Sequence, residues 1–244
     1  MIRLFNESDM KSLRPDSEAA VRILGRLTAY GLDCYFAPCW TLVREGTAVT
    51  FLSIMDGNAV LAGDVDEELL MFINMKLEIR AIRTNRKNGE LIEQFEWDAE
   101  YGVVMTPGNA MDVPESPSCT LAPREIYPVV ESCFGDLGFD AWYVDVSHRI
   151  RHGCCRIAGI KEGNAVVCCA MTVSECDGAA LIGAVGTLPQ ARGRGYASSV
   201  VLHLARELDG EGKRVLLSPK NEGARRLYEK IGFVECGEWA ELRR

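Results

Sequence analysis

The sequence predicts an α/β (α+β) protein made of two related modules, each with three strands followed by a helix and a further strand. Three observations support this fold class. Each half of the chain contains three β-type runs separated by Glu-Gly and Asp-Gly turns. An amphipathic run with helical spacing comes next in each half. Between the halves, residues 105–118 are rich in Pro, Gly and Ser, which predicts a linker.

The first module, residues 1–104, begins with a helix whose apolar positions recur every three or four residues. Tight turns at Glu45-Gly46 and Asp56-Gly57 connect its three strands, because glycine readily adopts positive φ. The elements expected in this module are a helix at 16–30, strands at 40–44, 47–55 and 58–63, a helix at 66–75 and a strand at 77–82.

The second module, residues 119–244, repeats this order, with similar turns at Glu162-Gly163 and Asp177-Gly178. The expected elements are a helix at 123–134, strands at 155–160, 164–173 and 179–187, a helix with apolar positions from 197 to 208, a strand at 214–217 and a helix between 221 and 232. We interpret the modules as related in architecture. The alternative is that any βββαβ meander produces such a match.

The most informative stretch joins the strand at 179–187 to the next helix. It reads Val185-Gly186-Thr187-Leu188-Pro189-Gln190-Ala191-Arg192-Gly193-Arg194-Gly195-Tyr196-Ala197. Gly193 and Gly195 lack the side chains that would keep a ligand from the backbone, so amide N–H groups and the positive end of the helix can converge on an anion. The pattern predicts a pyrophosphate site, although a plain strand-to-helix connector has similar spacing.

A second motif, Asn221-Glu222-Gly223-Ala224-Arg225-Arg226-Leu227-Tyr228-Glu229-Lys230-Ile231-Gly232-Phe233, follows the strand at 214–217. Together the motifs resemble the GCN5-related N-acetyltransferase (GNAT) superfamily, whose members carry a Gln/Arg-x-x-Gly-x-Gly/Ala loop and an Asn-x-x-Ala-x-x-Leu-Tyr-x-x-x-Gly-Phe helix. The matching positions are Gln190, Gly193 and Gly195 in the loop, and Asn221, Ala224, Leu227, Tyr228, Gly232 and Phe233 in the helix. The resemblance implies a mixed central sheet of GNAT type in the C-terminal half, preceded by a related, degenerate βββαβ domain.

The resemblance also implies acetyl-CoA as a co-substrate, held in a V-shaped opening where two parallel strands part. Backbone groups of Val185 and Thr187 would pair with the pantetheine amides, and the loop amides would hold the pyrophosphate. The residues expected to bind the coenzyme are Val185, Thr187, Gln190, Ala191, Arg192, Gly193, Arg194, Gly195, Tyr196, Ala197 and Asn221. A dinucleotide-binding Rossmann fold is less favoured, because no acidic ribose ligand is evident after the turn.

Tyr228 is the catalytic residue that the resemblance implies, as a general acid toward the departing thiolate. A phenol with a reference pKa near ~10 is protonated at neutral pH and can donate a proton. The alternative role is an aromatic side chain that fills space between helix and sheet. The general base stays unassigned, since the strand at 179–187 has no carboxylate. Glu175 and Asp177 just before it could act directly or through a water chain, but we expect them to be solvated turn residues.

The first module has a different strand-to-helix turn, Gly63-Asp64-Val65-Asp66-Glu67-Glu68. Its four acidic residues would repel a pyrophosphate, so we expect no coenzyme site in this module. The polar segment around His148 and His152 has two interpretations, as part of an acceptor pocket or as a solvated loop.

Composition narrows the partners and the compartment. The net charge of −8 argues against nucleic-acid binding, which usually needs a basic face. No apolar run approaches the ~20 residues of a membrane span, and the start of the chain has no signal-peptide pattern. The ten cysteines contain no Cys-x-x-Cys pair and read as small buried side chains in a reducing compartment. These features predict a cytoplasmic protein without a metal site; a homodimer stays open.

The function expected from these observations is N-acetyltransferase activity. An acetyl group would move from acetyl-CoA to a primary amine of a small molecule or peptide, by direct attack in a ternary complex. The alternative is a non-catalytic module that binds acetyl-CoA or a protein partner. The sequence leaves the identity of the amine open, since many amines suit the same coenzyme machinery.

Overall fold

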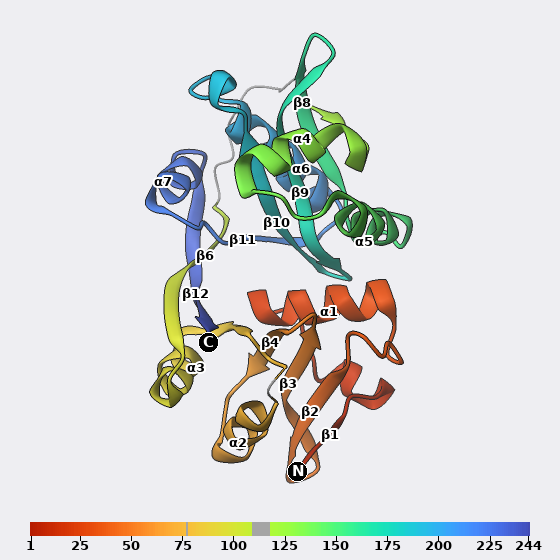
Figure 1. The fold of residues 1–244 in the computed structure, drawn as a ribbon, viewed down its shortest axis with the longest axis vertical. Coiled ribbons are helices and arrows are strands. Elements are labelled where there is room, and N and C mark those ends of the chain that lie inside the picture. Colours follow the sequence, from red (N-terminus) through yellow and green to blue (C-terminus); the bar gives the residue numbers. More distant parts are fainter. Residues whose placement is uncertain (77, 109–117) are drawn as a thin grey trace. The chain divides into compact units, whose positions relative to one another are not determined.

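The computed structural model describes residues 1–76, 78–108 and 118–244, and the chain divides into two compact units (Figure 1). The front unit comprises Met1–Val104 and Cys236–Arg244, and the back unit comprises Met105–Glu235. The predicted C-terminal domain, 119–244, differs from this division at its end. The last residues join the front unit because β12 (Phe233–Arg243) pairs antiparallel with β5 (Ala81–Asn85) from Trp239 onward.

The front unit is a mixed sheet with three α-helices. Its strands, in sheet order, are β1 (Ile2–Leu4), β2 (Cys39–Arg44), β3 (Thr47–Met55), β4 (Asn58–Gly63), β5 and β12. Only β4 and β5 among these neighbours run parallel. The helices are α1 (Glu18–Tyr30), α2 (Glu67–Met75) and α3 (Arg86–Ile92), with 3-10 turns at Glu7–Lys11 and Glu93–Phe95.

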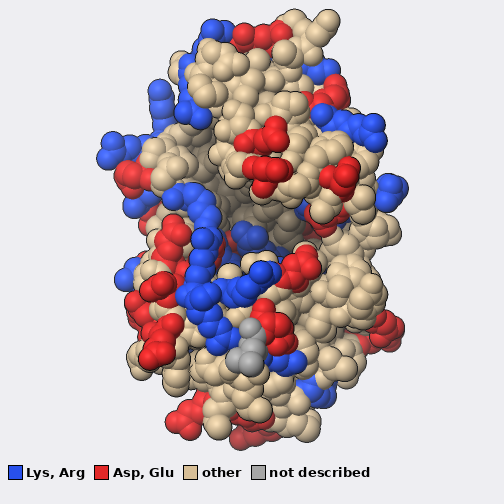
Figure 2. Space-filling model, viewed as in Figure 1, with Lys and Arg blue, Asp and Glu red and all other residues tan. Residues whose placement is uncertain are grey.

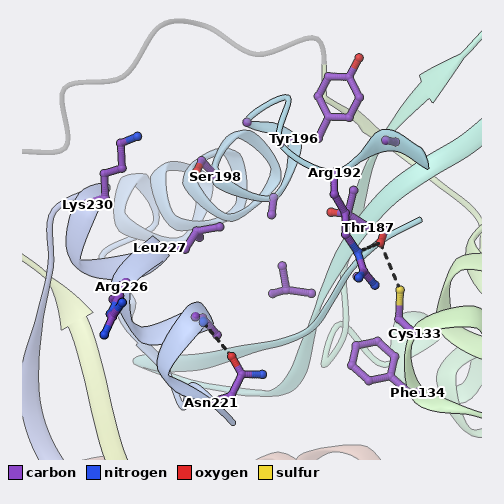
Figure 3. Close-up of a pocket in the computed structure, with 18 residues that line it drawn as sticks. Cys133, Phe134, Thr187, Arg192, Tyr196, Ser198, Asn221, Arg226, Leu227 and Lys230 are labelled. Atoms are coloured by element: carbon purple, nitrogen blue, oxygen red, sulfur yellow. Dashed lines mark hydrogen bonds between the residues drawn. The ribbon is translucent and has the colours of Figure 1, made fainter. Parts of the chain in front are cut away.

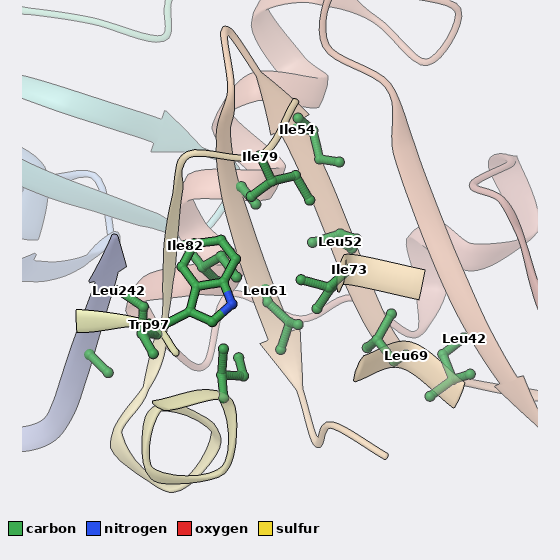
Figure 4. Close-up of a cluster of buried hydrophobic side chains, with 13 residues drawn as sticks. Leu42, Leu52, Ile54, Leu61, Leu69, Ile73, Ile79, Ile82, Trp97 and Leu242 are labelled. Carbon is green, nitrogen blue, oxygen red and sulfur yellow. The ribbon is translucent and has the colours of Figure 1, made fainter. Parts of the chain in front are cut away.

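An apolar cluster lies between α2 and the sheet of the front unit (Figure 4). Leu61 of β4, Ile73 of α2 and Ile82 of β5 are completely buried, and Trp97 packs with them. Each fully buried aliphatic side chain stabilises the fold by about 1.5–3 kcal/mol relative to exposure. This cluster packs α2 against the sheet.

The back unit has the same βββαβ order. Its strands, in sheet order, are β7 (Cys119–Thr120), β8 (Ile157–Glu162), β9 (Ala165–Cys176), β10 (Ala179–Thr187), β11 (Arg214–Leu217) and the end of β6 (Asp98–Pro107). The helices are α4 (Pro123–Phe134), α5 (Phe139–Arg151), α6 (Tyr196–Gly210) and α7 (Glu222–Lys230), with a 3-10 turn at Pro189–Ala191. Only β10 and β11 run parallel.

Helices cover both faces of the back unit's sheet, with α4 on one face and α6 on the other (Figure 1). Cys169 and Met171 of β9 pack with Ile126 and Val129 of α4 in one buried cluster. Because side chains alternate along a strand, the residues between them face α6. The buried faces explain why β9 and β10 are apolar at consecutive positions.

The predicted fold class is confirmed, and so is the βββαβ order of both modules. The strand expected at 77–82 is wrong in its bounds, since β5 begins only at Ala81. The chain turns before it, where Ile79 N donates to Lys76 O and Arg80 N donates to Gly57 O. The polar segment with His148 and His152 is not a loop but the end of α5 and its C-cap.

The predicted linker, 105–118, is wrong at its start, because Met105 is completely buried in β6 and pairs with Leu217. Thr106 Oγ1 adds a hydrogen bond to Val215 O at 2.8 Å. Residues 109–117 of that segment lie outside the described residues. We did not predict β6 from the sequence, because the apolar residues of this strand alternate only over a short run.

All ten cysteines are free thiols, and six are buried, including the adjacent pairs Cys154-Cys155 and Cys168-Cys169. On the face shown in Figure 2, acidic and basic side chains are interspersed. Within residues 1–76, 78–108 and 118–244, no helix is long and apolar enough to cross a membrane.

Candidate functional site

Strands β10 and β11 part in the middle of the back unit. They pair from Ala179 and Arg214 to Ile182 and Leu217, where β11 ends while β10 continues to Thr187. The register between β9 and β10 shifts on both sides of Gly183, and Ala184 has a φ of +47°. Such a φ is uncommon for a residue with a side chain and marks a bulge. The far end of β10 is therefore free of a β11 partner.

The loop after β10 ends in two glycines with left-handed backbone. Gly193 has a φ of +76° and Gly195 a φ of +79°, which other residues adopt at a cost of about 1–2 kcal/mol. Gly195 is the N-cap of α6 and offers no side chain to cap it. The first amide groups of α6 are thus left without side-chain acceptors, at the positive end of the helix dipole.

A cavity of about 810 Å³ lies between this loop, the end of β10, α7 and the end of α4 (Figure 3). Its volume is in the range of small-molecule sites. Nine of the predicted coenzyme contacts line it: Val185, Thr187, Ala191, Arg192, Gly193, Gly195, Tyr196, Ala197 and Asn221. The structure thus brings together residues from the two sequence motifs.

Gln190 and Arg194 are the predicted contacts that do not line the cavity. The Arg194 guanidinium donates to Glu162 Oε1 at 2.6 Å and to Gln190 O at 3.3 Å. The Tyr196 hydroxyl donates to the same Glu162 oxygen at 2.8 Å. Glu162, at the end of β8, therefore pairs with Arg194, the arginine that we expected to contact the coenzyme.

Sequence reasoning missed half of the cavity wall. The additional lining residues are Cys133, Phe134, Gly186, Ser198, Gly223, Ala224, Arg226, Leu227 and Lys230. Positions 223, 226, 227 and 230 follow helical spacing, so one face of α7 was visible as a stripe in the sequence. Cys133 and Phe134 had no such signal, because they meet β10 only through tertiary packing.

Gly186 explains how α4 reaches the cavity. A Cβ at this position would lie 3.1 Å from Cys133 Sγ and 3.3 Å from a methyl group of Val129. The Cys133 thiol donates to Thr187 O at 3.6 Å, and Arg192 Nε donates to the same oxygen at 3.1 Å. The glycine lets α4 approach the strand end closely.

Tyr228 does not line the cavity but lies buried behind it, with 7% of its surface exposed. Burial raises the pKa of its phenol to about 12, and the nearby Cys168 thiol acts in the same direction. Thr187 Oγ1, which belongs to the cavity wall, donates to Cys168 Sγ at 3.2 Å. Tyr228 therefore lies close to the parted strands and stays protonated at neutral pH.

Asn221 caps α7, the helix that carries Tyr228, since its Oδ1 accepts a hydrogen bond from Ala224 N at 2.9 Å.

Within the part of the chain that the structure describes, the residues that line the cavity include no Asp, Glu or His. The expectation that Glu175 is solvated is wrong, since only 1% of it is exposed. It pairs with Arg156 at 2.5 Å and Lys213 at 2.6 Å. Glu175 lies opposite Ala180 of β10, five residues before Val185 of the cavity wall, and both basic partners engage its carboxylate. Asp177 is exposed at the turn.

The histidines are also outside the cavity wall. The rings of His148 and His152 lie 4.1 Å apart at the end of α5, and His203 is half-buried in α6. Among the described residues, no group of three or more His, Cys, Asp or Glu is arranged to hold a metal ion.

Comparisons with known proteins agree with this geometry. Residues 158–243 match the model of the FR47-like protein family. A GCN5-related N-acetyltransferase from Sphaerobacter thermophilus is 19% identical with a TM-score of 0.69, and the match covers 100% of this chain and 95% of that one. An acetyltransferase from the GNAT family of Colwellia psychrerythraea is 12% identical with a TM-score of 0.60, covering 100% and 99%.

A tandem GNAT protein from the clavulanic acid biosynthesis pathway is 12% identical with a TM-score of 0.63, and the match covers 100% of this chain and 98% of that one. No curated protein matches the sequence. At these identities the likeness concerns the fold. The resemblance predicted from the two motifs is confirmed at that level, and the tandem protein is consistent with two related modules.

Proposed function

We propose that this chain, which has the fold of the GCN5-related N-acetyltransferases, transfers an acetyl group from acetyl-CoA to a primary amine of a small molecule or peptide. One observation carries the proposal: the opening between β10 and β11 leads into a cavity that ends at the uncapped N-terminus of α6. A thioester with an anionic pyrophosphate tail matches this combination of free strand edge and free amides.

Each wall of the cavity has a part in binding. The backbone of Val185 and Thr187 would pair with the pantetheine amides along the unpartnered end of β10. The amides from Ala191 to Ala197 would hold the pyrophosphate, and Arg192, which lines the cavity, adds a positive charge. Asn221 supports the opposite wall by capping α7.

The proposed reaction is direct attack of the amine nitrogen on the thioester carbonyl carbon. A C–N bond forms, the C–S bond breaks, and the thiolate takes up a proton. Tyr228, with its pKa raised to about 12 by burial, remains a hydrogen-bond donor at neutral pH. Full proton transfer from such a phenol to a thiolate with a reference pKa of about 8.5 is uphill, so Tyr228 would act mainly by donating a hydrogen bond to the sulfur.

This role requires the sulfur to reach the side of Thr187 and Cys168, where Tyr228 is buried. Because the described residues of the cavity wall include no carboxylate or imidazole, the amine would enter as the neutral base and release its proton to water. The ratio kcat/KM should then rise with pH through the pKa of the free amine.

The first experiment is calorimetric titration with acetyl-CoA of the wild type and of a Gly193→Ala/Gly195→Ala double variant. We expect the wild type to bind and the double variant to lose affinity by 10-fold or more, because both positions need a positive φ. Gly210→Ala is the matched control, since Gly210 lies at the far end of α6 with open space around its Cα. A folded wild type that fails to bind acetyl-CoA would remove the assignment.

The competing function is a non-catalytic module that binds acetyl-CoA or a protein partner. It is favoured by two observations: no described residue of the cavity wall is a carboxylate or an imidazole, and Tyr228 is buried and does not line the cavity. Release of free thiol in the presence of an amine panel separates the two functions. Tyr228→Phe should lower kcat by about 10²-fold or more and leave the Kd for acetyl-CoA unchanged. Equal turnover would remove the role of Tyr228, and a wild type that binds acetyl-CoA but releases no thiol with any amine would favour the binding module.

We also propose a cytoplasmic location, supported by the ten free thiols, six of them buried. The chain would act on a small amine without nucleic-acid or membrane partners.

A further inference from the structure

The cavity has a second cationic side, away from the loop that follows β10. Arg226 and Lys230 extend from α7, and Arg192 lies across the cavity from them (Figure 3). Among the described residues, these three are the only Lys, Arg, Asp, Glu or His side chains in the cavity wall. The wall is therefore positive in a protein whose net charge is −8.

The two α7 cations are poorly neutralised by the protein itself. Within the described part of the chain, Lys230 forms no ion pair. Arg226 pairs with Glu222 of the same helix, but the two side chains are 75% and 59% exposed. Exposed pairs of this kind contribute little. The neighbouring Arg225, outside the wall, instead contacts Glu229 and Glu235.

Their spacing suits a single anionic group. Arg226 and Lys230 are four residues apart in α7, which places their Cα atoms about 6 Å from each other on one face. Two long side chains that start so close together can converge on one phosphate. The pyrophosphate does not need them, because the α6 amides and Arg192 already face its proposed position.

We propose that Arg226 and Lys230 bind the 3′-phosphate of the coenzyme's ribose and make the site selective for coenzyme A over 3′-dephospho-coenzyme A. This inference rests on the proposed coenzyme site. A phosphate monoester carries about −1.5 to −2 charges near pH 7, more than any one of these cations neutralises. Its removal leaves Lys230 without a counterion, so the difference in affinity between the two ligands measures this contact.

The test is calorimetry of four proteins with coenzyme A and with 3′-dephospho-coenzyme A at one low salt concentration. The proteins are the wild type, Lys230→Gln, Arg226→Gln/Lys230→Gln and the control Arg225→Gln. We expect the wild type to prefer coenzyme A by about 10- to 100-fold. Lys230→Gln should retain part of this preference, and the double variant should bind both ligands with the affinity of the wild type for the dephosphorylated one.

The outcomes separate this inference from the proposed function. Equal wild-type affinities for the two ligands, or a preference that survives in the double variant, would overturn the role of α7 while leaving the coenzyme site intact. A double variant with an unchanged preference but a raised KM for the amine would assign the cations to an acidic acceptor instead, and would also overturn it. Binding of neither ligand by folded wild type would overturn both proposals. Control Arg225→Gln should keep the full preference.

Discussion

The strand-to-helix turns of the two units follow the same topology but have opposite chemistry. In the back unit, α6 starts at Gly195 without a side-chain cap. In the front unit, Asp66 caps α2 by accepting from Leu69 N at 3.0 Å. Arg44 pairs with both Asp66 and Glu68. The carboxylates of the front turn thus cap the helix and pair with Arg44 of β2. The back turn leaves the amides of its helix free for a ligand.

The ends of the parallel strands, β4 and β5 in the front unit and β10 and β11 in the back unit, differ in the same way. In the front unit, the completely buried Asn88 of α3 lies at the end of β4. Its amide nitrogen donates to Gly63 O at 2.7 Å, and its amide oxygen accepts from Val65 N at 3.1 Å. In the back unit, the corresponding end of β10 borders the cavity. The βββαβ order alone therefore does not make an anion site; unsatisfied backbone groups are also needed.

The largest expected effect concerns how a helix is fixed to each sheet. In the back unit α4 uses apolar residues, whereas Glu18 of α1 is buried and pairs with Arg83 at 2.9 Å and Arg22 at 2.8 Å. Glu18→Gln should reduce the free energy of unfolding by about 3–5 kcal/mol at pH 7, because the buried Arg83 loses the charge of its closer carboxylate partner and keeps Glu241 at 3.2 Å. Three of the four tryptophans, Trp40, Trp97 and Trp239, report on the front unit during denaturation.

The same carboxylate predicts a pH dependence. Burial by itself raises the pKa of Glu18, but the charges of Arg22 and Arg83 outweigh it and lower the pKa from 4.5 to about 2. A group with a lowered pKa in the folded state stabilises the fold above its unfolded pKa. The contribution is complete above about pH 4.5 and is lost as the pH falls toward 2. Glu18→Gln should flatten the stability curve in this window, and equal slopes would contradict the prediction.

A second prediction tests whether Asn88 stabilises the front unit by filling the space at the end of β4. Asn88→Ala leaves Gly63 O and Val65 N without their partner, which costs about 1–3 kcal/mol for each buried group. Asn58→Ala, at an exposed position, is the control and should stay within about 0.5 kcal/mol of the wild type. If Asn88→Ala unfolds at the wild-type denaturant concentration, other contacts stabilise the end of β4.

Sequence reasoning succeeded where the cause was local and failed where it was tertiary. Two helix starts could be recognised from residue type alone: the acidic turn from Asp64 to Glu68, and the glycines at 193 and 195, which have positive φ in the structure. Asn88 could not be predicted, because its role depends on α3 lying beside Gly63. Glu175 looked like a solvated turn residue until Arg156 and Lys213, distant in sequence, were placed beside it.

The smallest expected effect distinguishes the two arginines of the back loop, and it sharpens the comparison between the turns. Arg192 lines the cavity and contacts Thr187 O, whereas Arg194 is held by Glu162, much as Arg44 is held by Asp66 in the front unit. Arg192→Gln should weaken acetyl-CoA binding about 10-fold, since a charge-assisted contact is lost. Arg194→Gln should change the Kd by less than about threefold, because Arg194 lies outside the cavity wall and its guanidinium is directed to Glu162 and to Gln190 O. Calorimetry at one salt concentration checks both values. The opposite order would mean that Arg194 leaves Glu162 when the coenzyme binds, and that the back turn, unlike the front turn, releases its internal ion pair to a ligand.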